Sequence, residues 1–447
     1  MISHAESMAR APSKSFVDRY FVFLMVVLAG YAVGGRGFAY FGYAPLFVGE
    51  MLVIAGFVAL LKTRCAVAAL TSVPSALLAV LMAWVLARTL PSVPSHGFDA
   101  LRDSVIVMYG AITFVVVGLL VDRPERLRHL FDVYGKFAGI YVVAMMVLYP
   151  LSLLFYASVP VWPWSGAPVF GMRSGEVAVH ITGAALFAFL GFRRFNSLSI
   201  LALFLCFIMV AANSRGGMLA IVLPVMLVFL LVPNTRQIGP LVLIGSVIIF
   251  TALILDVELV ILGDRKLSAQ QIFWNFMSIV DSSDHLTLDG TKQWRLMWWE
   301  KIVSYTFYGD YFWSGKGFGV NLADVDGFQV NDLEKGPLLR SPHNAHMTML
   351  ARGGVPGLVL WALTLGGWVV SMLRSYLVAR RHGDRAWARL FVFLLGYWLS
   401  IVVNASFDVA LESPMLGLWF WTLFGVGIAA TMIYWHERTD CGVRSPP

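Results

Sequence analysis

The feature that most limits what this chain can fold into is a series of apolar runs, each long enough to cross a lipid bilayer. A transmembrane helix needs about 20 mainly apolar residues. Because lipid offers no hydrogen-bond partner to the backbone, runs as long and continuous as these are expected to be helices. They fall at about 20–35, 43–61, 72–90, 104–121, 137–158, 177–192, 197–213, 216–233, 240–262, 345–373, 389–410 and 415–434.

The composition excludes a soluble enzyme and a disordered chain. Of the 447 residues, 59% are hydrophobic and 13% are charged, whereas soluble domains have about 45–50% apolar and about 25% charged residues. We therefore expect an all-α polytopic membrane protein with about twelve transmembrane helices. Nine lie in 1–262, a large extramembrane loop containing helices occupies 263–344, and three helices and a tail occupy 345–447, all within one functional domain.

Basic residues set the orientation of the predicted helices. With the N-terminus inside, the inner loops and tail hold 19 Lys and Arg residues. Lys and Arg accumulate in short cytoplasmic loops, so both termini are expected in the cytoplasm and the loop 263–344 on the outer side. The net charge of +7 is then a sign of topology and not of nucleic-acid binding. The short outer loops hold only five arginines, namely Arg36, Arg88, Arg102, Arg173 and Arg215.

The large loop contains one helical pattern. Aromatic and apolar residues recur at spacings of three and four, which places them on one face of a helix opposite several basic residues. Such a helix is expected to lie along the membrane surface. The apolar face would consist of Trp294, Met297, Trp298, Ile302 and Tyr305.

A histidine stands where the tenth predicted helix begins. Ser341 is a favoured N-cap and Pro342 a favoured first helical residue, which would put His343 in the first turn. There the helix dipole disfavours a charged imidazole, so His343 is expected to be neutral and able to act as a general base. The alternative is a polar histidine at the membrane interface that only supports the loop. His346, one turn further on, is expected to matter less.

Two arginines are candidate anion ligands on the same side. Arg215 stands in Asn213-Ser214-Arg215-Gly216-Gly217, where a helix start, a guanidinium and glycines suit a phosphate. Arg215 could equally extend to the interface from an ordinary turn. Arg295 lies within the helical pattern described above. Lys316, in the glycine-rich stretch 314–319, could also contact an anion.

Metal and cysteine chemistry are not expected. His343 and His346, or Asp324 and Asp326, come without a clear third ligand. The three cysteines Cys65, Cys206 and Cys441 are scattered, so neither a structural disulfide nor a cysteine metal site is predicted.

Taken together, these motifs resemble the O-antigen ligase and polymerase superfamily. Their order is Arg215 in Ser-Arg-Gly-Gly, Arg295 followed by Trp299, the glycines at 315, 317 and 319, His343-Asn344, and the glycines at 353 and 354. The resemblance implies a metal-independent, inverting glycosyltransferase in the bacterial inner membrane, without a cofactor. Its donor would be a glycan on undecaprenyl pyrophosphate, and transfer to an acceptor hydroxyl would take place at the periplasmic face.

The residues fit that chemistry. A departing pyrophosphate needs its charge stabilised, which Arg215 and Arg295 could do, while His343 could take the proton of the acceptor hydroxyl. We expect an O-antigen ligase that uses lipid A–core as acceptor. An O-antigen polymerase and a protein O-oligosaccharyltransferase are alternatives with the same fold. A transporter of lipid-linked glycans is a more distant one, because transporters usually place their polar residues near the membrane midplane.

Overall fold

The computed structural model describes residues 15–155, 158–232, 258–262, 265–268, 286–329 and 339–443. Within these residues, seven helices are long and apolar enough to cross a membrane, and four shorter apolar helices accompany them. The chain is therefore a multi-pass, predominantly helical membrane protein.

The first part of the chain forms a run of helices with one small hairpin. In order, the elements are α1 (Phe16–Gly34), α2 (Arg36–Ala39), β1 (Gly42–Tyr43), β2 (Leu46–Phe47), α3 (Val48–Leu61), η1 (Ala68–Leu70), α4 (Val73–Thr89), η2 (Leu90–Ser92), α5 (Val93–His96), α6 (Phe98–Met108), α7 (Ala111–Asp122) and α8 (Glu125–Leu154).

The second part adds the remaining bundle helices and an extramembrane helix. These elements are α9 (Ser174–Phe189), α10 (Ser197–Asn213), α11 (Arg215–Leu231), β3 (Glu258–Leu262), β4 (Arg265–Ser268), α14 (Leu286–Phe307), α15 (Leu322–Asp326), α16 (Ala345–Arg381), α17 (Arg385–Ala405) and α18 (Pro414–Val443).

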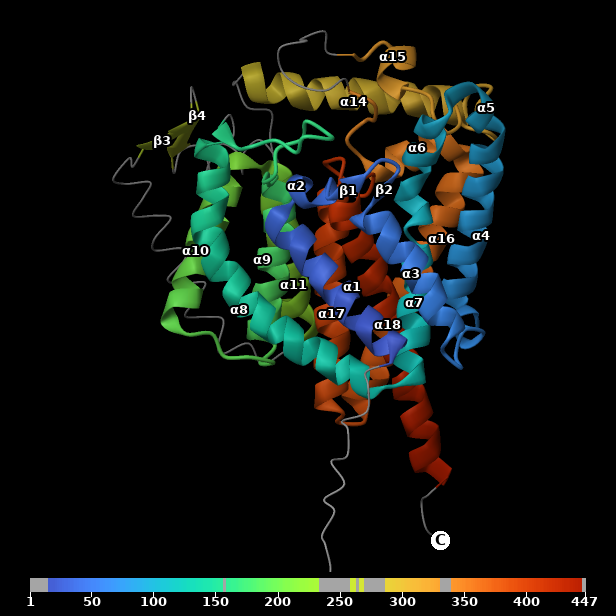
Figure 1. The fold of residues 1–447 in the computed structure, drawn as a ribbon, viewed down its shortest axis with the longest axis vertical. Helices are drawn as coiled ribbons and strands as arrows, with labels where there is room; N and C mark the ends of the chain where they lie inside the picture. The colour runs from blue at the N-terminus through green and yellow to red at the C-terminus, as the bar shows by residue number, and fades with distance from the viewer. Residues whose placement is uncertain are drawn as a thin grey trace, which may run out of the picture.

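The long helices stand side by side in a bundle, and α14 runs across one of its ends (Figure 1). The beginning of α1 and the end of α18 lie at the opposite end. The connections between α7 and α8, between α9 and α10 and between α16 and α17, which carry many of the basic residues, also lie at that end. In this arrangement the helix starts of α9, α11 and α16 come together beneath α14.

Buried indoles join the helices of the core. Trp421 of α18 donates from its indole nitrogen to the carbonyl of Ile106 in α6 at 3.0 Å, and Trp368 of α16 donates to Phe424 in α18 at 2.8 Å. An unpaired buried N–H would cost about 1–3 kcal/mol. These bonds therefore allow large side chains to fill the core while their polar atoms stay satisfied.

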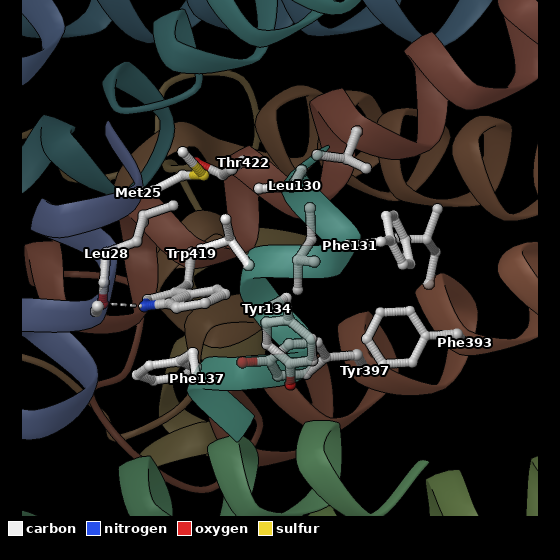
Figure 2. Close-up of a pocket in the computed structure, with 15 residues that line it drawn as sticks. Met25, Leu28, Leu130, Phe131, Tyr134, Phe137, Phe393, Tyr397, Trp419 and Thr422 are labelled. Carbon is white, nitrogen blue, oxygen red and sulfur yellow. Dashed lines mark hydrogen bonds between the residues drawn. The ribbon is translucent and has the colours of Figure 1, made fainter. Parts of the chain in front are cut away.

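An apolar pocket of about 80 Å³ lies between α1, α8, α17 and α18. Figure 2 shows rings of Tyr134, Phe137, Tyr397 and Trp419 around it, with Trp419 donating to the carbonyl of Leu28. Its lining is almost entirely apolar and includes no charged side chain. This pocket is not the candidate site.

The structure amends the expected all-α architecture. Two short antiparallel hairpins are present, β1 with β2 and β3 with β4. The second predicted span, 43–61, begins with the first hairpin, so that its helix starts only at Val48. The ninth predicted span, 240–262, lies mostly outside the described residues, and its last five residues form strand β3 instead of a helix.

Helix α14 forms as the pattern predicts, and part of its apolar face is buried against protein. Trp298 and Ile302 are fully buried, in a cluster with Leu350 and Ala351 of α16. The expected position of Met297 is wrong, because its side chain is 61% exposed. Packing on α16 holds α14 over the end of the bundle, where Arg295 reaches the site described below.

Candidate functional site

Beneath α14 the structure contains a cavity of about 720 Å³. All three site residues expected from the sequence line it, namely Arg215, Arg295 and His343. They come from three elements that are far apart in the chain, and they meet because α14 lies over the start of α11 and the loop before α16. The remaining lining residues include Arg173, Ser174, Asn213, Ser214, Trp299, Asn404, Phe407 and Asp408.

Arg215 is the first residue of α11. Ser214 is the N-cap, and its hydroxyl accepts a hydrogen bond from the backbone N–H of Gly217 at 3.0 Å. This cap fixes where the helix begins and so holds the guanidinium at the cavity wall. The helix start predicted from Ser214-Arg215-Gly216-Gly217 is confirmed.

Arg295 reaches the cavity from α14. One of its terminal nitrogens donates to the carbonyl of Phe407 at 2.9 Å, and its buried Nε has no partner in the described part of the chain. Burial lowers the pKa of Arg295. The carboxylate of Asp408 raises it, and the positive charge of Arg215 lowers it. Two guanidinium groups that repel each other form a site that an anion would stabilise.

His343 lies just outside α16 and not in its first turn. The N-cap is Asn344, whose side chain accepts from the backbone N–H groups of His346 and Met347. The expectation that Ser341 caps the helix is therefore wrong. His343 has a φ of 53°, a left-handed conformation that costs free energy for any residue with a side chain.

The strained turn at His343 is held from α14. The indole nitrogen of Trp299 donates to the carbonyl of Pro342 at 2.9 Å. Trp299 lies one helical turn beyond Arg295 on α14. The helix therefore contacts the loop at His343 through Trp299 and contributes Arg295 to the anion site.

His346 is engaged on both ring nitrogens. Its Nδ1 accepts from the indole N–H of Trp361 at 3.0 Å, and its Nε2 lies 3.1 Å from the hydroxyl of Ser406. Because an indole can only donate, the proton of this imidazole is on Nε2. His346 does not line the cavity, so it joins helices and is not placed for chemistry.

Two charged residues that the sequence analysis did not select complete the site. Asp408, between α17 and α18, has its Oδ1 at 3.6 Å from Nδ1 of His343 and at 3.8 Å from a guanidinium nitrogen of Arg173. Burial raises the pKa of Asp408, but the contact with His343 and the charge of Arg173 outweigh it, so the pKa lies below its usual range. Asp408 is therefore a carboxylate at neutral pH.

The net charge of the residues that line the cavity favours binding of an anion. Three guanidinium groups face a single carboxylate among the lining residues. The N-termini of α9 and α11 also open at the cavity wall, and their partial positive charges add to the effect. The arrangement can hold a phosphate or pyrophosphate beside a histidine–carboxylate pair.

The glycine-rich stretch has a packing role. The backbone N–H groups of Lys316 and Gly317 donate to the carbonyls of Ala351 and Arg352 in α16. A side chain on Gly315 would collide with that backbone, so glycine is required there. The Lys316 ammonium pairs with Asp326, and the expectation that it could contact an anion in the site is wrong.

Among the described residues, no three His, Cys, Asp or Glu side chains come together in a group that could hold a metal ion. The charges that would face an anion in the cavity are guanidinium groups.

Comparison with known proteins adds one finding. Residues 200–362 match a family model described as O-antigen ligase. This match supports membership of the chain in the O-antigen ligase/polymerase superfamily. A comparison with curated proteins gives no match. The segment matched to the superfamily contains Arg215, Arg295 and His343, while Arg173 and Asp408 lie outside it.

Proposed function

We propose that the protein is an inverting glycosyltransferase that moves an O-antigen glycan from undecaprenyl pyrophosphate to a sugar hydroxyl of lipid A–core. The observation that carries the proposal is the single cavity in which Arg215, Arg295, His343 and Asp408 meet. Superfamily membership supports the lipid-linked donor.

In the proposed reaction, Arg215 and Arg295 bind the pyrophosphate of the donor. The acceptor hydroxyl attacks the anomeric carbon from the face opposite the pyrophosphate, forming the new glycosidic bond. The bond between that carbon and the phosphate oxygen breaks, and undecaprenyl pyrophosphate leaves with the electron pair. The arginines stabilise the negative charge that grows on the leaving oxygen.

The proton of the acceptor hydroxyl goes to His343. Its Nδ1 faces Asp408 at 3.6 Å, which leaves Nε2 to accept the proton. The carboxylate of Asp408 then stabilises the imidazolium that forms, as in other histidine–carboxylate pairs. The left-handed backbone at His343 supports this role, since such strain is concentrated at functional sites.

The proposed orientation places the cavity at the periplasmic face of the inner membrane and both termini in the cytoplasm. The basic bias of the loops supports it, because the loops rich in Lys and Arg share one end of the bundle and the cavity lies at the other. Donor and acceptor lipids would both be reached from the outer leaflet.

An O-antigen polymerase and a protein O-oligosaccharyltransferase would use the same groups with a different acceptor. The test is transfer of native lipid-linked donor by the purified protein to lipid A–core, to a second donor molecule or to a serine-containing peptide, each with and without EDTA. We expect transfer to lipid A–core that persists in EDTA. Transfer only to one of the other acceptors would reassign the function, and loss of activity in EDTA would contradict the mechanism.

A further inference from the structure

Next to the cavity, five aromatic rings form a continuous row on the same end of the bundle. Phe38 stacks on Phe41 with ring centroids 6.3 Å apart, and Phe41 meets Trp162 at 6.1 Å. Trp162 stacks on Trp164 at 4.8 Å, and Trp164 meets Tyr43 at 5.5 Å. We call these five residues the aromatic row.

The aromatic row is built from two loops that are locked together. One joins α1 to α3 and contains the β1–β2 hairpin, and the other joins α8 to α9. The indole nitrogens of Trp162 and Trp164 donate to the carbonyls of Gly37 and Tyr40, at 2.8 and 2.9 Å. These bonds fix the planes of both indoles before any ligand arrives.

Exposure varies along the row. Phe38 packs inward against Tyr31, whereas Phe41 is 50% exposed, Trp164 37% and Tyr43 71%. A tryptophan that anchors a protein at the membrane interface directs its N–H towards water or headgroups. Here both indole N–H groups are used inside the protein, so the exposed parts of the row are apolar ring atoms.

One of the two loops that carry the row continues into the wall of the cavity. The backbone N–H of Arg36 donates to the carbonyl of Gly171 at 2.9 Å, which joins the two loops at the base of the row. The next residues after Gly171, from Met172 to Ser174, line the cavity. A chain of sugars attached to a pyrophosphate held by Arg215 and Arg295 could therefore run from the cavity onto the row.

We propose that the aromatic row is a subsite for the glycan of the donor, beyond the sugar that is transferred. Pyranose rings carry C–H groups on their faces, and these pack well on fixed aromatic rings. Phe41, Trp164 and Tyr43 expose ring surface along the row, so the row would contact several sugars of a long glycan and none of a short one. This inference rests on the proposed function, because it takes the donor to be a lipid-linked glycan.

The first test measures transfer kinetics with the native donor pool separated by glycan length. Trp164→Ala and Tyr43→Ala should each raise KM for long donors by roughly three- to tenfold, the size of one aromatic contact. They should leave kcat, and KM for a donor with one repeat unit, unchanged. Trp164→Phe keeps a ring and should retain most of the affinity. The matched control is Trp313→Ala, which removes an indole that is 73% exposed and does not line the cavity.

Unchanged kinetics with long donors would overturn the proposal. An equal loss with long and short donors, together with poor recovery of the variants in membranes, would also overturn it and make the row a membrane anchor. A second measurement does not depend on transfer. Saturation-transfer NMR with the glycan released from its lipid should show binding to the wild type and not to Trp164→Ala. If binding is seen but no acceptor is ever glycosylated, the proposed function fails and the subsite stands.

Discussion

The role of Asp408 can be tested by Asp408→Asn, which removes the charge and keeps the shape of the side chain. The carboxylate lies 3.6 Å from Nδ1 of His343, and both side chains are less than a third exposed. Two unit charges at that distance attract by about 4–5 kcal/mol at an effective dielectric constant of about 20, and by half as much at about 40. This attraction is gained only when His343 takes the proton.

If the proton is about half transferred in the transition state, the variant loses about 1–2 kcal/mol, which is roughly a five- to thirtyfold lower kcat. The donor KM should change little, because Arg215 and Arg295 remain.

The assay is initial-rate transfer to lipid A–core over a range of donor concentrations. Asp324→Asn is the control, because that side chain lies on the exposed face of α15 and away from the cavity. A kcat for Asp408→Asn equal to that of the wild type would refute the pairing. A large rise in KM at constant kcat would instead place Asp408 in substrate binding.

Four further predictions concern the two arginines, His343, His346 and the topology. Arg215→Ala and Arg295→Ala should each lower donor binding about ten- to a hundredfold, measured as KM, and lysine should restore only part of it because it lacks the planar fork. His343→Ala should lower transfer by about 10²–10⁴ while donor binding, measured by titration, persists. His346→Ala should keep the transfer rate and lower the melting temperature, since that ring only links helices. A cysteine placed at Glu300 in a cysteine-free background should react with an impermeant thiol reagent in cells with a permeable outer membrane, and protection of that cysteine would reverse the topology.

The helical bundle and three of the residues that line the cavity could be predicted from the sequence. Long apolar runs have few alternatives in lipid, so most of the predicted spans correspond to helices. Arg215 could be placed because a local signal, a serine cap followed by glycines, fixes where its helix starts. The start of α16 could not be placed in the same way. Ser341 and Asn344 are both good caps, and only tertiary contacts, including that of Trp299 with Pro342, decide between them.

Asp408 and Arg173 were missed because neither has a local pattern around it. Asp408 lies in a short connection after α17, and its role depends on His343, 65 residues earlier in the chain. Arg173 carried one weak signal, since it is among only five arginines in the short outer loops. The packing of α14 on α16 could not be predicted for a related reason. An amphipathic pattern shows that one face is buried, but not whether lipid or protein buries it.

The way the cavity is divided among distant segments has a consequence for how the protein is made. Its walls come from residues between Met172 and Asp408, so most of the chain must leave the ribosome before the site can close. A nascent chain that has inserted every helix up to α16 already carries the three arginines and the histidine, yet lacks the carboxylate. The cavity therefore stays incomplete until the connection after α17 has been translated.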